Sequence, residues 1–154
     1  MSSIQIRKSS FSDLDELLAW RMEVLHEVFG IPQEADVSAL ENANLEYYRH
    51  AFLDGSHIAC FALYDGIKIG CGAACLQEEM PSPDNPSGKC AYLMNIYVRP
   101  QFRRLHIGTA IVEWLIKEAR RNGAGKIYLE TSDAGRKMYR RLHFQEMKDL
   151  MILK

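Results

Sequence analysis

Residues 97–120 read YVRPQFRRLHIGTAIVEWLIKEAR, and this stretch decides the fold. Its first two residues end an apolar run, AYLMNIYV at 91–98, which is typical of a buried strand. An arginine-rich turn follows. From Ile107 to Asn122 apolar residues recur at helical spacing, and Gly123 is a helix stop signal. The stretch therefore predicts a strand, a turn and an amphipathic helix in immediate succession.

The start of this helix is a candidate anion site. The first N–H groups of a helix have no partners within it and carry a partial positive charge. Gly108 would let a ligand approach the backbone closely, and Arg99, Arg103 and Arg104 add positive charge. The same residues also fit a solvated basic turn. The sequence contains neither the P-loop pattern nor the glycine pattern of dinucleotide-binding folds.

The remaining segments complete a mixed α/β pattern. Strands are expected at 4–9, 57–64, 67–76 and 126–131, with a final strand or two within FQEMKDLMILK at 144–154, and helices at 14–29, 38–54 and 134–142. Asp65-Gly66 is a strong signal for a two-residue hairpin, which makes its strands antiparallel. The later strand–helix–strand units favour parallel neighbours. We therefore expect one α/β domain over residues 1–154, a mixed sheet with helices on both faces.

Composition limits the class of protein. A length of 154 residues suits one domain, and 47% hydrophobic with 25% charged residues is ordinary for a soluble globular chain. No run is long enough for a membrane helix and no signal peptide is evident, so a cytoplasmic protein without membrane contact is expected. Cys60, Cys71, Cys75 and Cys90 form no C-x-x-C pair. They are expected to be buried thiols rather than ligands of a metal.

The charges are divided unevenly along the chain. Residues 1–98 carry six Lys/Arg against fourteen Asp/Glu, a balance of −8, whereas residues 99–154 carry thirteen against six, a balance of +7. Such a division indicates an anionic ligand on the second half, or two ligands of opposite sign. Nucleic-acid binding is disfavoured because the whole chain is not basic.

Two stretches resemble the GNAT (GCN5-related N-acetyltransferase) superfamily. Residues 97–120 resemble motif A of that family, a strand, [Q/R]-x-x-G-x-[G/A] and a helix, with Arg103 at the first position and Gly108 at the last. YLETSDAGRKMYRRLHF at 128–144 resembles motif B, with Tyr139 and Phe144 at the tyrosine and phenylalanine positions. The two motifs at this separation are specific, and together they cover about residues 90–145.

The resemblance implies a GNAT-type acyl-CoA N-acyltransferase fold and an acetyl-CoA site. The strand before the turn would pair through its backbone with the pantetheine arm, and the turn amides would hold the pyrophosphate. Tyr139 would donate a proton to the leaving CoA thiolate. The implied cofactor-binding set is Ile96, Tyr97, Val98, Arg103, Arg104, Leu105, His106, Ile107, Gly108, Thr109, Ser132 and Tyr139.

Three positions depart from the family pattern. His106 replaces the first glycine of the turn, and His143 replaces the glycine before Phe144. Glycine is used where φ is positive or the backbone approaches a ligand, and histidine is among the residues more tolerant of positive φ. The ring of His106 would either crowd the phosphates or hydrogen-bond to one. Ser132 stands where motif B often has an asparagine.

The acceptor side carries weaker signals. An ammonium must lose a proton before it attacks, and Glu78 and Glu79 are the first candidates for the base, although they also fit a solvated loop entrance. Asn95 interrupts an apolar strand and is a candidate to orient the substrate. Arg21 would line the acceptor pocket or pair with a nearby acid. His26, His50 and His57 lie in no motif and are expected at the surface.

The leading hypothesis is an N-acetyltransferase that moves the acetyl group of acetyl-CoA to a primary amine of a small molecule, peptide or protein. The charge division favours a cationic acceptor, and the resemblance allows a homodimer. A non-catalytic acyl-CoA-binding or sensing module is the alternative that the two histidines keep open. A third hypothesis is an unrelated α/β domain with another phosphate ligand.

Overall fold

The computed structural model describes residues 3–154 and contains one five-stranded sheet. The strands lie in chain order: β1 (Ile4–Lys8), β2 (His57–Tyr64), β3 (Ile67–Glu78), β4 (Lys89–Val98) and β5 (Lys126–Leu129). The first four are antiparallel to their neighbours, and β4 and β5 are parallel. The expected mixed sheet is confirmed.

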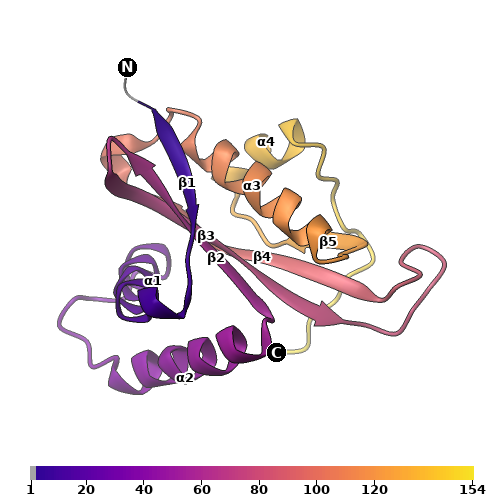
Figure 1. Ribbon diagram of the computed structural model, residues 1–154, viewed down its shortest axis with the longest axis horizontal. Coiled ribbons are helices and arrows are strands. Elements are labelled where there is room, and N and C mark those ends of the chain that lie inside the picture. Colours follow the sequence, from indigo (N-terminus) through magenta and orange to yellow (C-terminus); the bar gives the residue numbers. More distant parts are fainter. Residues whose placement is uncertain (1–2) are drawn as a thin grey trace.

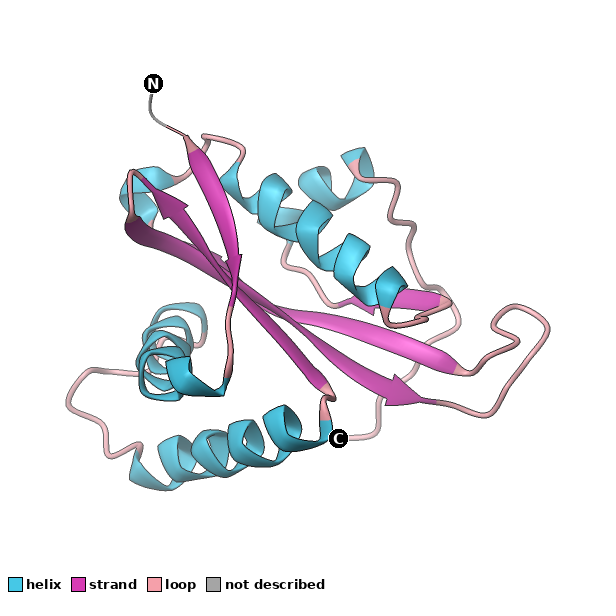
Figure 2. Cartoon of the chain, viewed as in Figure 1, coloured by secondary structure: helices cyan, strands magenta, loops and turns pink. Residues whose placement is uncertain are grey.

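Helices cover both faces of this sheet (Figures 1 and 2). Their bounds are α1 (Leu14–Val28), α2 (Ser38–Asp54), α3 (Ile107–Arg121) and α4 (Asp133–Arg141), with short 3-10 helices η1 (Phe11–Asp13) and η2 (Pro100–Phe102). The first two helices lie on one face, and the last two lie on the other. Within residues 3–154, no helix is both long enough and apolar enough to cross a bilayer.

Each face of the sheet has its own apolar core. On the α3 face, Ile69, Leu93 and Leu115 are almost fully buried in one cluster. On the α1 face, Trp20 meets the ring of Phe61 edge to face, with centroids 5.6 Å apart. The central strands are buried on both sides because helices cover both faces, which is why β2 reads as a nearly continuous apolar run.

The predicted hairpin is present between β2 and β3. Asp65 and Gly66 both have positive φ, 47° and 80°, as the two central residues of a type I′ turn require. Cys60, Cys71 and Cys90 are buried, and the described residues contain no disulfide. Burial raises the pKa of the Cys60 thiol to about 12, so this thiol stays protonated and inert.

The strand predicted within residues 144–154 does not form. This segment is irregular throughout, and Glu146 within it makes ion pairs with Arg136 (2.6 Å) and Arg140 (2.9 Å) of α4. Glu146 therefore ties the segment to the surface of α4 rather than to the free edge of β5. Phe144 at its start packs against the core on the α3 face, but the apolar side chains near its end do not, since Met151, Ile152 and Leu153 are 95%, 79% and 98% exposed. An apolar pattern is not sufficient for a strand, because a strand also needs a neighbouring strand with which to pair.

Candidate functional site

The site is built where β4 and β5 separate. The two strands pair only from Cys90 opposite Lys126 to Leu93 opposite Leu129. Beyond that point β4 continues from Met94 to Val98, and its edge on the β5 side has no strand partner among the described residues. Its backbone groups are therefore available to a ligand that adopts the place of a strand.

A bulge marks the start of this unpaired edge. The register between β3 and β4 shifts between Cys71 and Ala73, and Asn95 adopts a left-handed φ of 58° opposite the shift. A bulge bends a strand and redirects its side chains. It turns the side chain of Asn95 to the α1 face, where its Oδ1 accepts a hydrogen bond from Arg21 (3.0 Å).

The turn after β4 presents a run of free backbone donors. In residues 3–154, none of the N–H groups from Arg104 to Thr109 makes a hydrogen bond to the protein. Arg104 and His106 both have left-handed φ, 65° and 60°, and His106 is the residue that precedes α3. These free amides, together with the positive end of α3, fit a phosphate group. His106 thus takes the backbone conformation for which the family uses glycine.

The arginines of the turn have different partners. Arg99 pairs with Glu23 (3.0 Å) and Arg103 with Glu27 (2.5 Å), both on α1. Arg104 is exposed and makes no ion pair with any described residue. Of the three, Arg104 is therefore the one whose charge is uncompensated beside the free amides.

The other predicted residues of β4 contribute backbone rather than side chains. The Tyr97 ring is buried on the α1 face and its hydroxyl donates to Glu27. Ile96 and Val98 pack into the core on the α3 face. The Val98 carbonyl already accepts a hydrogen bond from Arg103 Nε (2.9 Å), so a ligand at this carbonyl must share it or displace the arginine.

Side-chain packing joins the start of α3 to α4. A Cβ on Gly108 would lie 3.2 Å from Met138 Sδ, so this glycine permits the close approach of α4 as well as of a ligand. Tyr139, next along α4, is 9% exposed, and its hydroxyl makes no hydrogen bond with residues 3–154. Burial raises its pKa, so the phenol is protonated at neutral pH. Ser132 is the exposed N-cap of α4.

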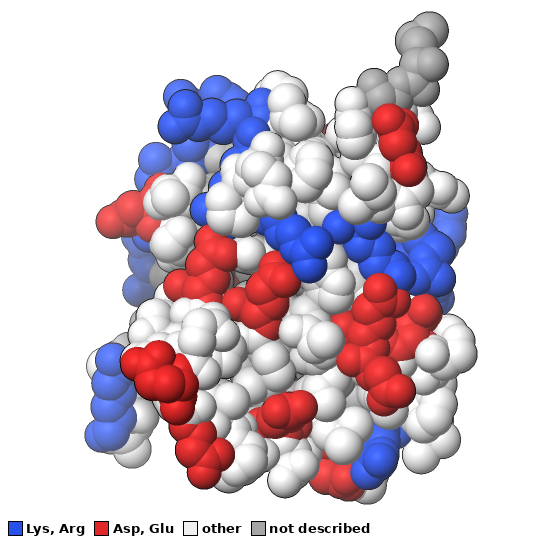
Figure 3. Space-filling view, turned by 90° about the vertical axis from the view of Figure 1, so that its left-hand side faces the viewer, with Lys and Arg blue, Asp and Glu red and all other residues white. Residues whose placement is uncertain are grey.

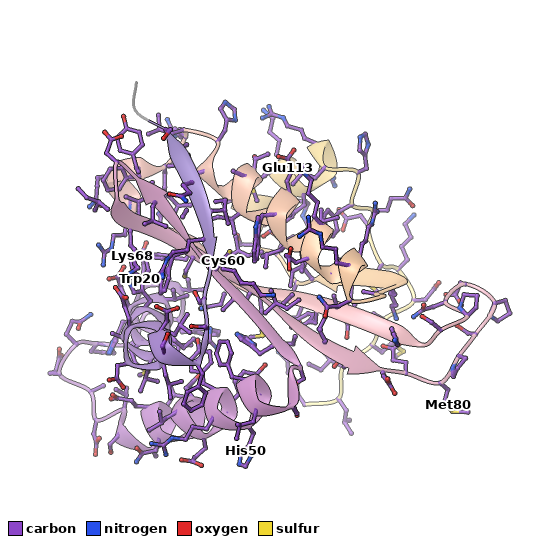
Figure 4. All side chains as sticks on the ribbon, in the orientation of Figure 1. Trp20, His50, Cys60, Lys68, Met80 and Glu113 are labelled. Atoms are coloured by element: carbon purple, nitrogen blue, oxygen red, sulfur yellow. The ribbon has the colours of Figure 1, made fainter. Side chains whose placement is uncertain are left out.

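The predicted base residues lie away from these groups. Glu78 is opposite Lys89 at the far end of the β3–β4 ladder, and Glu79 makes an ion pair with Lys126 (3.1 Å). Lys89 is six residues from Asn95 along β4, which is roughly 20 Å of strand. Figure 4 places Met80, next to Glu79, at the opposite end of the molecule from Trp20, next to Arg21. The structure does not bring Glu78 and Glu79 together with Asn95.

A polar cluster on the α1 face was not found from the sequence. The Tyr47 hydroxyl lies 2.8 Å from His57 Nδ1 and 3.0 Å from Cys75 Sγ. His57, predicted at the surface, is 7% exposed, and its Nε2 has no partner in residues 3–154. Burial, and secondarily the charge of Arg21, lowers its pKa to about 4. Its place in an apolar strand was the signal that could have revealed its burial.

Comparisons with known proteins agree with this geometry. The family model described as "Acetyltransferase (GNAT) family" matches residues 15–144. Among solved structures, a predicted acetyltransferase from Clostridium acetobutylicum, determined with acetyl-CoA, has a TM-score of 0.86 at 24% identity, covering 99% of this chain and 96% of that one. A GCN5-related N-acetyltransferase from Ralstonia eutropha has a TM-score of 0.82 at 20% identity, covering 99% of both chains.

A third structure, aminoglycoside N-acetyltransferase AAC(6')-Iy in complex with CoA, has a TM-score of 0.75 at 18% identity and covers 100% of this chain and 95% of that one. A comparison with curated protein sequences gives no match. At these identities the structural neighbours establish the fold. The match over residues 15–144 shows that the chain belongs to the acetyltransferase (GNAT) family.

Proposed function

We propose that the protein transfers the acetyl group of acetyl-CoA to a primary amine. The observation that carries this proposal is the run of free N–H groups from Arg104 to Thr109, directly beside the unpaired edge of β4. The amides suit the pyrophosphate, and the strand edge suits the amide-containing pantetheine arm. Family membership and a neighbour solved with acetyl-CoA support the same donor.

In the reaction, the acceptor nitrogen attacks the thioester carbonyl carbon. A C–N bond forms, the C–S bond breaks, the nitrogen gives up a proton, and the thiolate takes one. Tyr139 is the proposed source of the thiolate's proton, because its buried phenol stays protonated and its hydroxyl is not engaged within the described protein. The proton from the nitrogen goes to a base, for which Glu78 and Glu79 remain a prediction that their distance from Asn95 does not support.

A thermal-shift experiment tests donor binding. A ligand at 100 times its Kd stabilises a protein by about 2.7 kcal/mol, and each kcal/mol moves the Tm of a domain this size by roughly 2–4 °C. Acetyl-CoA should therefore raise Tm by several degrees, while NAD and ATP should raise it little. Equal shifts with all three ligands would contradict an acetyl-CoA site. CoA release with a panel of amines then separates an enzyme from a non-catalytic binder, which is stabilised without turnover.

The acceptor is proposed to be a small amine, and three of the neighbours are aminoglycoside acetyltransferase complexes. The predicted cationic acceptor rested on the acidic balance of residues 1–98. Part of that charge is used inside the molecule, since Glu23, Glu27 and Glu79 pair with basic residues of the second half. Acidic and basic side chains accordingly lie side by side in Figure 3. Cationic, neutral and anionic amines in one acceptor panel test the prediction.

We also propose a homodimer, formed through the irregular C-terminal segment and the free edge of β5. Exposed apolar residues in this segment, and an unpaired parallel edge strand, are features that a second copy would cover. Light scattering should give twice the mass of the chain, and Ile152→Glu should shift the mass towards the monomer. Because Ile152 is 79% exposed, the monomer's Tm should not change. A wild-type mass equal to one chain contradicts the dimer.

A further inference from the structure

Arg21 is a cation whose partners are neutral. From α1 its Nε donates to Asn44 Oδ1 of α2 (3.1 Å), and its Nη1 donates to Asn95 Oδ1 of β4 (3.0 Å). Within residues 3–154, no carboxylate lies within 4.0 Å of this guanidinium. Its Nη2 makes no hydrogen bond with any described residue. The side chain is only partly exposed, so water compensates its charge incompletely.

The isolation of Arg21 is not caused by a lack of acids on the same helix. Glu16, Glu23 and Glu27 of α1 all reach towards the sheet, and each pairs with another basic residue, namely Lys68, Arg99 and Arg103. Lys68 of β3 and the two arginines of the turn after β4 thus each have a carboxylate partner on α1, whereas Arg21 has none among the described residues. Two amide oxygens hold this partly buried guanidinium in place but do not neutralise its charge. The charge and the remaining N–H donors are therefore available to a ligand.

The position of Arg21 connects it to the proposed reaction. Asn95 belongs to the bulge where the unpaired edge of β4 begins, and that edge is where the donor is proposed to bind. The Asn95 side chain points to the α1 face, opposite to the α3 face on which Ile96 and Val98 pack. The open donors of Arg21 therefore lie on the α1 side of β4, and the side chain of Asn95 connects Arg21 to the start of the unpaired edge.

We infer that the acceptor carries an anionic oxygen group, a carboxylate or a phosphate, in addition to its amine, and that Arg21 binds this group. The inference rests on the proposed acetyltransferase function and narrows its acceptor to a small zwitterionic amine, such as an amino acid or an aminoalkyl phosphate. A guanidinium binds either group through charge-assisted hydrogen bonds, and it cannot lose its proton at any working pH. The amine itself arrives as a cation and needs no second positive charge.

Matched acceptors and variants test this inference. The acceptors are amino acids, aminoalkyl phosphates, and the neutral amides or alcohols with the same amine. In the wild-type protein an anionic acceptor should have a kcat/KM about 10- to 100-fold above that of its neutral partner. Arg21→Gln should bring this ratio close to one, and Arg21→Lys should retain part of it. Arg49→Gln is the matched control, because Arg49 is an exposed arginine of α2 paired with Glu46, and it should keep the wild-type ratio.

Three outcomes overturn the inference. The first is a wild-type protein that uses neutral amines as well as anionic ones. The second is an Arg21→Gln variant whose kcat/KM falls equally for the anionic and the neutral acceptor of each pair, since Arg21 would then act on the acetyl group or on the fold. The third applies if Arg21→Gln does not fold: Arg21→Met, which keeps most of the length of the side chain without its charge, then takes its place, and an unchanged ratio in a stably folded Arg21→Met variant overturns the inference. The proposed function fails in a different way, if acetyl-CoA raises Tm but no amine of any charge is acetylated. The first outcome leaves the proposed function intact, because neutral amines are then still acetylated.

Discussion

At the scale of single residues, Tyr139 is the group whose chemistry can be tested most directly. Tyr139→Phe removes only a hydroxyl that has no partner among the described residues, so the fold should be retained. We expect the Kd for acetyl-CoA to be unchanged and kcat to fall about 10²–10⁴-fold, the usual contribution of a general acid. Tyr64→Phe removes a hydroxyl from a tyrosine that packs against Phe102 and should leave kcat unchanged. A fully active Tyr139→Phe variant would mean that water, or another group, protonates the thiolate.

His57 predicts a specific dependence of stability on pH. Its pKa in the folded protein is about 4, against 6.5 for an ordinary histidine. Above pH 6.5 the ring is neutral in both states and contributes nothing to the pH dependence. Below 6.5 the unfolded chain binds a proton that the folded chain does not, so the free energy of unfolding falls until pH 4, by about 3 kcal/mol in all.

Denaturant unfolding of the wild type and of His57→Gln at pH 7.0, 5.5 and 4.5 measures this effect. Carboxylates titrate similarly in both proteins, so the difference between the two curves isolates the histidine. The wild type should lose roughly 2–3 kcal/mol more than the variant over this range. Parallel curves would show that folding does not lower the pKa of this ring, because the folded and unfolded chains would then bind the same number of protons there.

Residue roles were predictable from the sequence only where a motif surrounds the residue. His106 and His143 were identified as substitutes for glycine, and both have left-handed φ, 60° and 70°. The burial of His57 and the partners of Arg21 were not predicted from the sequence, because both depend on how α2 lies against the sheet. Contacts between residues distant in the sequence, such as Arg21 with Asn44 and Asn95, leave no local pattern.

At the scale of elements, the turn before α3 offers a second test. His106 is exposed, has a left-handed φ and lies within the run of free amides, so we expect its ring to compete for the space that the phosphates need. We expect His106→Gly to tighten acetyl-CoA binding, measured by calorimetric titration at pH 6 and pH 8. His50→Ala is the control, since it changes an exposed histidine of α2, which lies on the other face of the sheet from α3. Weaker binding by His106→Gly, most of all at pH 6, would mean that the imidazole binds phosphate.

Helices and strands were predictable where the segment has an apolar pattern and the chain also provides a neighbouring element to pack against. The helices and the first five strands follow from their apolar periods and stop signals, because each has a face to bury against a neighbour. The segment 144–154 has an apolar pattern too, but Glu146 holds its start on α4 and the strand expected from that pattern has nothing to pair with. The apolar periodicity of a segment indicates which of its side chains would be buried. It does not indicate whether the rest of the chain provides a surface for them to pack against.

At the scale of the whole molecule, the charge division has a structural use. The acidic first half and the basic second half are joined by ion pairs between α1 and the turn, Glu23 with Arg99 and Glu27 with Arg103. Each pair is partly exposed and contributes only about 0–1 kcal/mol. Their combined effect is to fix the position of the turn relative to the helix that carries Arg21. A charge imbalance along a sequence can thus describe an internal interface rather than an external ligand.

The short ladder between β4 and β5 has a consequence for amide hydrogen exchange. β5 has four residues, all partly exposed, and its single strand neighbour among the described residues is β4, whereas β2 and β3 are paired on both sides over most of their length. Local opening should therefore expose β5 and α4 at a smaller cost in free energy than the central strands. Amides of Ile127–Leu129 and of α4 should exchange faster than those of β2 and β3. If acetyl-CoA binds between β4 and α4 as proposed, it should slow exchange in both elements. Tyr139 then lies on α4, in the part of the molecule that opens first. Binding of the donor would hold β4 and α4 together before the acetyl group is transferred.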